Sequence, residues 1–145
     1  MNIVKKRLGI EVINLSEYIL PNCINIMYDK DEYDSIIISY HNSYNLNVKM
    51  IIDKNYPFKS VKIFVNNKCF DNILKQNIYL IDLNKELSYP DCFCCTSLTC
   101  CNNWNPKVSL IDLEKEITYV LTCKLNILHI YYCRKLALQY LVQDI

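Results

Sequence analysis

Five of the nine cysteines of this 145-residue chain lie within residues 92–101. They are Cys92, Cys94, Cys95, Cys100 and Cys101. A thiolate is a strong nucleophile and a good leaving group near neutral pH. The only tryptophan, Trp104, follows, and Asn105–Pro106 then favours a turn into a helix. The pattern predicts a cysteine-bearing loop braced by one large aromatic side chain, which would hold a nucleophile in a productive geometry.

Three interpretations of the cysteine cluster stay open. One thiol is a nucleophile, or the thiols pack as small buried hydrophobic groups, or they bind zinc. For zinc, Cys92 and Cys95 form one half-site, which Cys100 or Cys101 would complete. A second Cys-x-x-Cys pair is missing, so the spacing alone is weak evidence for a metal. Zinc could also stiffen the loop beside a nucleophile.

The composition restricts the classes of protein to which this chain can belong. A chain that is 52% hydrophobic and 21% charged predicts one globular domain over residues 1–145. The net charge of +1 argues against nucleic acid and acidic membranes as partners. The single glycine excludes glycine-rich phosphate loops. No membrane-spanning run or signal peptide is found, so we expect an intracellular, reducing location.

The elements that must position the cysteines follow from hydrophobic periodicity. Residues 2–19 are expected to form a helix that Pro21 ends, with most of its charged residues off the apolar stripe. That stripe consists of Val4, Leu8, Val12, Leu15 and Ile19. Four strands with short turns follow, over residues 24–28, 35–40, 46–52 and 61–65. With no helix between them, they predict an antiparallel meander, in which asparagine, aspartate and serine supply the turns that glycine cannot.

The second half of the chain is expected to be a long ordered loop followed by helices. The loop covers residues 66–90, with an extended piece at 78–81 and a helical turn at 84–87. Ser109 and Asp112 form a capping box that begins a helix. Its predicted stripe is Leu110, Leu113, Ile117 and Leu121. After a break at 124–126, a last helix over 127–142 carries Ile130, Cys133, Ala137 and Leu141 on one face.

The predicted fold class is therefore α+β: an N-terminal helix, a four-stranded antiparallel meander, a long cysteine-rich loop and two C-terminal helices. Residues 47–63 contain Tyr56-Pro57-Phe58-Lys59, and Trp104-Asn105-Pro106 follows the cysteines. With these motifs in this order of elements, the chain resembles the ubiquitin-conjugating enzyme family. Residues 47–63 resemble the third strand, turn and fourth strand of that family, and Trp104-Asn105-Pro106 resembles its Trp-Ser-Pro motif. The resemblance covers roughly residues 3–122 and implies a divergent member, with a viral source as one option.

The resemblance implies a function. Such a protein accepts ubiquitin or a ubiquitin-like modifier from an activating enzyme as a cysteine thioester, and a ligase directs transfer to a lysine, without metal or nucleotide at this step. We favour Cys94, because Leu98 follows at the family's spacing. Cys95 is second and Cys92 third. The alternatives are a catalytically inactive variant that binds ubiquitin or a ligase, and a zinc-stabilised interaction domain.

The resemblance also assigns further residues. Asn72 is the candidate for the oxyanion-stabilising asparagine, although the His-Pro-Asn motif of the family is not intact. A second candidate segment, Tyr89-Pro90-Asp91, lies too close to the cysteines. Four residues are expected to contact the ligase or the activating enzyme: Lys5, Lys6, Phe58 and Pro106. Three are expected to be structural: Tyr56, Pro57 and Trp104.

Overall fold

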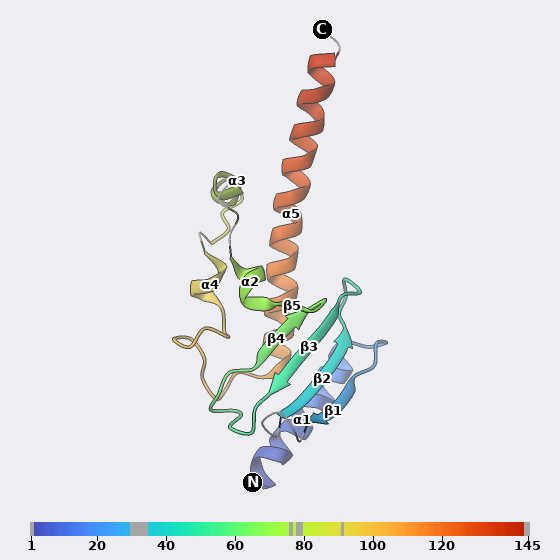
Figure 1. Cartoon of the computed structure of the whole chain (residues 1–145), viewed down its shortest axis with the longest axis vertical. Helices are drawn as coiled ribbons and strands as arrows, with labels where there is room; N and C mark the ends of the chain where they lie inside the picture. The colour runs from blue at the N-terminus through green and yellow to red at the C-terminus, as the bar shows by residue number, and fades with distance from the viewer. Residues whose placement is uncertain (1, 30–34, 76, 78–79, 91, 144–145) are drawn as a thin grey trace.

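The computed structural model describes residues 2–29, 35–75, 77, 80–90 and 92–143, with side chains from residue 5 onward. It has an α+β fold with an N-terminal helix α1 (Asn2–Tyr18), an antiparallel sheet and a long C-terminal helix α5 (Leu110–Gln143), as Figure 1 shows. The predicted fold class is confirmed at this level. The predicted turn at 29–34 falls largely outside the described residues.

In the part of the chain that the structure describes, the sheet is a meander of five strands in sequence order. They are β1 (Asn25–Asp29), β2 (Ser35–His41), β3 (Asn47–Ile52), β4 (Lys62–Val65) and β5 (Lys68–Cys69). The antiparallel meander is confirmed, but the predicted count of four was wrong. The fifth strand has only two residues, which is too short for any periodicity. It pairs through the two-residue turn Asn66–Asn67.

Asparagine and serine supply the left-handed backbone, as the sequence predicts. The residues with positive φ are Asn45, Asn66, Asn67 and Ser88, at 57°, 48°, 64° and 58°. Two successive residues with positive φ form the tight turn that suits the twist of a hairpin. Asn66 also accepts a hydrogen bond from the backbone N–H of Asn47 through its side chain, at 2.8 Å. The β4–β5 turn is thereby fixed without glycine.

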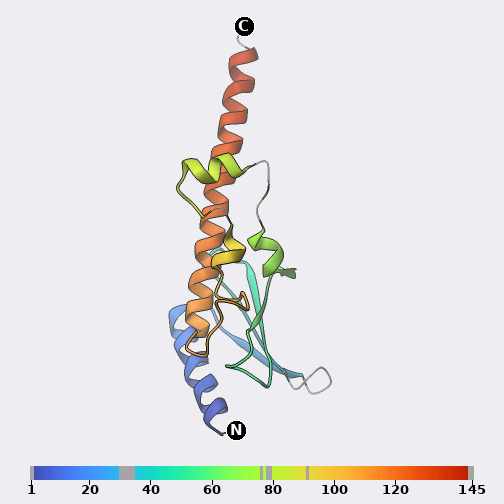
Figure 2. The same ribbon diagram turned by 90° about the vertical axis from the view of Figure 1, so that its left-hand side faces the viewer.

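One face of the sheet packs against the first half of α5. The buried strand residues are Ile38, Tyr40, Val48, Met50, Ile52, Ile63 and Val65. The register places Met50 between Ile38 and Ile63, so these side chains share one face. Five residues of α5 are buried in the same core, namely Leu110, Leu113, Ile117, Val120 and Cys123. Figure 2 shows α1 and α5 together on one side of the sheet.

Helix α1 packs through the predicted stripe, but a charged residue joins it. Leu8, Leu15 and Ile19 are buried, and Val12 is partly buried. Glu11 is only 7% exposed. Its carboxylate accepts hydrogen bonds from three segments, and these compensate for its burial. The donors are Arg7 Nε at 3.2 Å, Tyr56 Oη at 2.6 Å and the backbone N–H of Leu110 at 3.2 Å.

The segment between the sheet and α5 is more helical than a loop. It contains α2 (Phe70–Leu74), α3 (Ile81–Glu86) and α4 (Phe93–Thr96). Helix α3 takes in most of the predicted helical turn at 84–87. The predicted extended piece at 78–81 is wrong at Ile81, which begins α3, and residues 78–79 lie outside the described part. Helices of four to six residues are too short to show the 3.6-residue period.

Helix α5 begins as predicted and does not break. The backbone N–H of Ser109 donates to Asp112 Oδ2 at 2.9 Å, and the N–H of Asp112 donates to Ser109 Oγ at 3.2 Å, which confirms the capping box. The predicted break at 124–126 was wrong. No proline or glycine stands there, and asparagine inside a helix costs only a few tenths of a kcal/mol. Lys124 and Asn126 instead bond outward, to Lys75 O at 2.8 Å and Tyr89 Oη at 3.0 Å.

The C-terminal half of α5 projects beyond the sheet (Figure 1). The residues predicted to share one face of the last helix are helical; Ile130 is partly buried, whereas Cys133, Ala137 and Leu141 are exposed. Arg134 pairs with Glu86 of α3 at 2.8 Å, and both side chains are more than half exposed. Among the described residues, no helix has the length and apolar character needed to cross a membrane.

The two halves of α5 provide a matched test of packing. We expect Leu113→Ala, at a fully buried position, to lower the free energy of unfolding by about 2–5 kcal/mol. Leu138→Ala makes the same change on the same helix at a side chain that is 63% exposed, and should cost less than about 0.5 kcal/mol. Urea unfolding of both variants measures the difference. Equal losses would mean that something covers the projecting half.

A second test uses the buried carboxyl group of Glu114, which is 2% exposed. It accepts hydrogen bonds from Tyr40 Oη and from Thr118 Oγ1. Burial raises the pKa of Glu114 above its ordinary 4.5, although the two hydrogen bonds oppose this. The folded protein therefore binds this proton more tightly than the unfolded chain. The contribution of the Glu114 carboxyl group to the free energy of unfolding is complete below pH 4.5. It is lost as the pH rises through the raised pKa.

We expect Glu114→Gln to flatten the decline in the free energy of unfolding above pH 4.5. Urea unfolding at a series of pH values measures the slope. Glu17→Gln, at an exposed position of α1, is the control and should leave the slope unchanged. An unchanged slope in Glu114→Gln would show that other groups control the pH dependence.

Candidate functional site

The thiols of Cys92, Cys94 and Cys95 lie on and beside the short helix α4. Cys92 directly precedes this helix, in an extended conformation with φ −144° and ψ 119°. The ring of Phe93 is buried and anchors α4 to the core. Cys94 is partly buried and packs against the core, whereas Cys95 is exposed. The buried ring of Phe93 thus positions a short segment whose three thiols differ in exposure.

The three thiols differ in the direction of their pKa shifts. Hydrogen bonding, first with the backbone N–H of Cys95, lowers the pKa of Cys92 below its ordinary 9.0. Burial, followed by the influence of Cys92, raises the pKa of Cys94. The influence of Cys92 also raises the pKa of Cys95. Among the three, Cys92 is thus the thiol whose surroundings favour the thiolate.

The loop after α4 is held by the carboxylate of Glu116 on α5. Its Oε2 accepts from Ser97 Oγ at 2.8 Å, and its Oε1 accepts from the backbone N–H of Leu98 at 2.7 Å. Burial raises the pKa of Glu116, and the two hydrogen bonds oppose that rise. Asn103 closes the loop by donating to the backbone oxygens of Cys95 and Ser97, at 2.8 and 2.9 Å. These contacts fix the backbone that carries Cys95.

Trp104 joins the cysteine loop to the turn after β3. Its indole Nε1–H donates to Pro57 O at 2.9 Å, and its ring centroid lies 6.3 Å from that of Tyr56. Its backbone N–H donates to Cys100 O at 2.9 Å. The guanidinium of Arg7, a residue of α1, lies 5.6 Å from the centroid of the Tyr56 ring. The residues expected to be structural are therefore in direct contact with one another.

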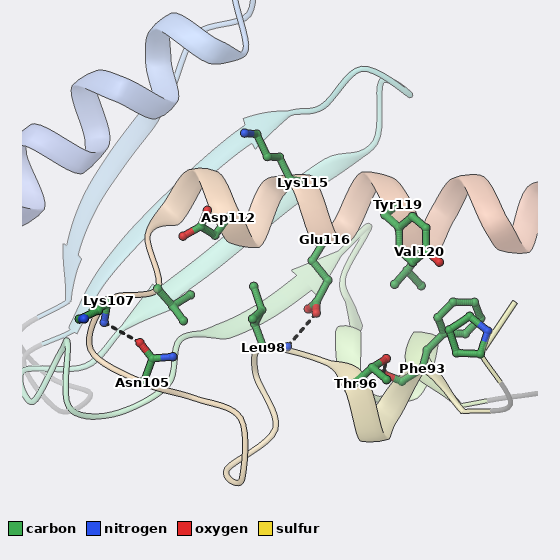
Figure 3. Close-up of a pocket in the computed structure, with 12 residues that line it drawn as sticks. Phe93, Thr96, Leu98, Asn105, Lys107, Asp112, Lys115, Glu116, Tyr119 and Val120 are labelled. Carbon is green, nitrogen blue, oxygen red and sulfur yellow. Dashed lines mark hydrogen bonds between the residues drawn. The ribbon is translucent and has the colours of Figure 1, made fainter.

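An open groove of about 760 Å³ runs between the cysteine loop and α5 (Figure 3). Its apolar lining includes Phe93, Leu98, Val108 and Val120. Figure 3 shows Glu116 pointing from α5 toward Leu98, across the groove. Thr96 also lines the groove, so the groove passes beside the helix that carries Cys95.

Two polar residues flank the thiols from other elements. Asn72 lies on the exposed side of α2, which packs beside α4 and turns Phe70 and Leu74 toward the core. Lys124 lies on α5, with its Nζ 5.9 Å from the centroid of the Phe93 ring. Burial lowers the pKa of Lys124, and the charge of Cys94 opposes this. Lys124 was not predicted as a site residue, because the sequence pattern indicated a break in the helix at 124–126.

The residues expected to contact partner proteins lie at one end of the molecule. Phe58 is 78% exposed, and Lys5, Lys6 and Pro106 are also exposed. Two contacts bring their segments together. Trp104 bonds to Pro57, next to Phe58, and Arg7 Nη2 donates to Val108 O at 3.3 Å. Arg7 itself is tied into this junction and is only partly exposed.

The described residues contain no group of three histidine, cysteine or acidic side chains placed to hold a metal ion. Of the cysteines in the proposed half-sites, Cys101 is exposed and its Sγ lies 3.9 Å from Asn102 Oδ1. The zinc hypothesis stays a prediction. Comparison with known proteins adds no family, since no family model, no curated protein and no solved structure matches this chain.

The role of Glu116 can be tested through the reactivity of a thiol. Glu116→Ala leaves Ser97 and Leu98 without their acceptor, so the loop should open and expose Cys94. A loss of about 1 kcal/mol for each of the two hydrogen bonds predicts a roughly 30-fold faster alkylation of Cys94. Glu116→Gln keeps an oxygen for Leu98 N–H and should leave the rate near that of the parent.

The measurement is a time course with iodoacetamide, read by mass spectrometry in a Cys95→Ser background. Cys133, exposed on the projecting half of α5, is the internal reference and should react at one rate in all variants. If Glu116→Ala accelerates Cys94 no more than Cys133, the carboxylate does not hold the loop closed.

Proposed function

We propose that this protein is a ubiquitin-conjugating enzyme-like protein that accepts ubiquitin, or a ubiquitin-like modifier, as a thioester and transfers it to a lysine. The observation that carries the proposal is the exposed thiol of Cys95, whose neighbour Thr96 lines an open groove. The loop bearing that thiol is braced through Trp104 against the Tyr56-Pro57 turn. These are the segments on which the resemblance to the family rests.

Cys95 is the acceptor that the geometry supports best. A modifier brings its C-terminal carbonyl to the sulfur, so the sulfur must be reachable by a protein-sized donor. Cys95 is exposed, whereas Cys94 packs against the core. Cys92 is the most acidic of the three but is partly buried. The order favoured by spacing, with Cys94 first, is therefore revised by exposure.

The groove beside Cys95 supplies a place for the C-terminal tail of a modifier. Its apolar floor would pack against the tail, and the charged side chains at its edge, among them Lys107 and Lys115, would face polar tail groups. A tail held in this way brings the reacting carbonyl to the thiol as an effectively intramolecular partner. The groove thus serves binding, and Cys95 serves acyl transfer.

The transfer step needs a donor for the oxyanion that forms when a lysine amine attacks the thioester carbonyl. Asn72 fills that role in the proposal, because its amide can donate and its helix α2 packs beside α4. The exposed residues Lys5, Lys6, Phe58 and Pro106 form the surface for an activating enzyme or a ligase. An exposed aromatic ring next to lysines suits a protein partner.

A non-reducing gel tests the proposal. The protein is incubated with ubiquitin, an activating enzyme and ATP, and we expect an adduct that thiol removes. Cys95→Ala should abolish the adduct. Cys95→Ser should give an adduct that survives thiol, because a hydroxyl acceptor forms an oxygen ester. Cys133→Ala, an exposed cysteine on α5, is the matched control and should keep the adduct.

Two outcomes would contradict the proposal. If no adduct forms in any variant, yet the protein binds ubiquitin or a ligase in a pull-down with purified components, the chain is a binding module. If Cys94→Ala abolishes the adduct and Cys95→Ala does not, the acceptor is Cys94 and exposure is a poor guide. Circular dichroism of each variant shows whether the fold is kept.

A further inference from the structure

A second cavity, of about 310 Å³, lies between β5, α3 and α5. It shares Phe93 with the groove beside the cysteine loop and otherwise has a lining of its own. Lys68, Asn84 and Lys124 bring polar groups to this cavity, and Phe93 and Ile127 add apolar surface. A cavity of this size and mixed lining is typical of sites for small organic molecules.

Asn84 is buried at this cavity with an unused hydrogen-bond acceptor. The residue is only 3% exposed. Its side-chain Oδ1 has no hydrogen-bond partner in the part of the chain that the structure describes. Buried side-chain oxygens in folded proteins are nearly always paired, so an unpaired one at a cavity indicates that a bound molecule supplies the donor.

Two lysines line the same cavity without a carboxylate to balance them. Within the described residues, neither Lys68 nor Lys124 forms an ion pair. Lys124 Nζ donates to Lys75 O at 2.8 Å, and an ammonium group has further protons for a ligand. Burial lowers the pKa of Lys124, and the positive charge of Lys68 lowers it further. An anion bound between the two lysines would relieve their repulsion.

We propose that this cavity binds a small phosphate monoester that also carries hydroxyl groups. A phosphate monoester has a charge close to −2 near pH 7, which matches two lysines, whereas a carboxylate would balance only one. Lysine is a common phosphate ligand and acts there as a point charge. A hydroxyl group of the ligand would donate to Asn84 Oδ1, and its carbon atoms would pack against Phe93 and Ile127. This site does not depend on the proposed acyl transfer.

The wall of the cavity that carries Asn84 is held against α5 by contacts on either side. Arg134 of α5 pairs with Glu86 of α3 at 2.8 Å. Asn126 Nδ2 donates to Tyr89 Oη, just after α3, at 3.0 Å. The polar groups of the cavity are therefore in place before a ligand arrives, which reduces the entropy lost on binding.

Isothermal titration calorimetry of the full chain with three probes tests the proposal. Ribose 5-phosphate carries both the charge and the hydroxyl groups, and we expect it to bind with one molecule per chain. Inorganic phosphate should bind more weakly, because it makes no apolar contact. Ribose should not bind detectably, because it leaves the two lysines without an anion.

Variants locate the site. Lys68→Ala changes an exposed residue, so the fold should be kept, and the affinity for ribose 5-phosphate should fall about tenfold or more. Lys85→Ala, at an exposed position of α3 outside the cavity, is the matched control and should leave the affinity unchanged. Asn84→Leu removes the acceptor, so ribose 5-phosphate should then bind no better than inorganic phosphate.

Four results would overturn the proposal. The wild-type chain binds ribose 5-phosphate with a Kd weaker than about 1 mM, or it binds ribose as tightly as the phosphate. Lys68→Ala and Lys85→Ala weaken binding equally, which would mean attraction to general surface charge. Asn84→Leu folds, as circular dichroism would show, and binds ribose 5-phosphate as before.

The first three results need no change at a buried residue, so a misfolded Asn84→Leu variant cannot hide the answer. Cys95→Ala should bind ribose 5-phosphate like the wild type, because Cys95 does not line this cavity. Failure of ubiquitin loading and failure of the phosphate site are therefore distinguishable.

Discussion

The buried carboxylate of Glu11 is the interaction on which the site end of the molecule depends. It takes hydrogen bonds from Arg7 in its own helix, from Tyr56 in the turn after β3 and from the first backbone N–H of α5. Such a group is stable only while its partners are in place, and removing one partner of a buried charge costs about 3–5 kcal/mol. The helix, the turn and the start of α5 therefore have one mutual arrangement. Trp104 packs against the same Tyr56, with the two ring planes tilted by 55°, so the position of the cysteine loop depends on Glu11 through Tyr56.

Hydrophobic periodicity predicted the elements that are long enough to show it. Helix α1, four strands and the start of α5 follow from stripes such as Leu8 and Leu15, and from the capping box of Ser109 and Asp112. The two-residue strand β5 and the helices α2 to α4 are shorter than one period of any pattern. Continuity of α5 depends on contacts of Lys124 and Asn126 with distant residues, which no local pattern encodes.

The candidate site, like the fold, was predictable from the sequence only in part. Clustered cysteines followed by a lone tryptophan predicted where to look, because residue types carry the chemistry. Which thiol is exposed depends on how Phe93 seats α4, and spacing in the sequence does not encode that. Glu116 and Asn103 were missed for a related reason. They act by bonding to backbone groups of an irregular loop, and such contacts leave no periodic signal.

Exposure and restraint meet at one residue of the cysteine loop. Cys95 presents its thiol to solvent, while its backbone oxygen accepts a hydrogen bond from Asn103 at 2.8 Å. Asn103 also donates to Ser97 O, and Ser97 Oγ donates to Glu116, so the backbone beside the exposed thiol is tied to α5. A thiol that is open to a partner on a backbone that is held in place is the arrangement that the proposed acyl transfer needs.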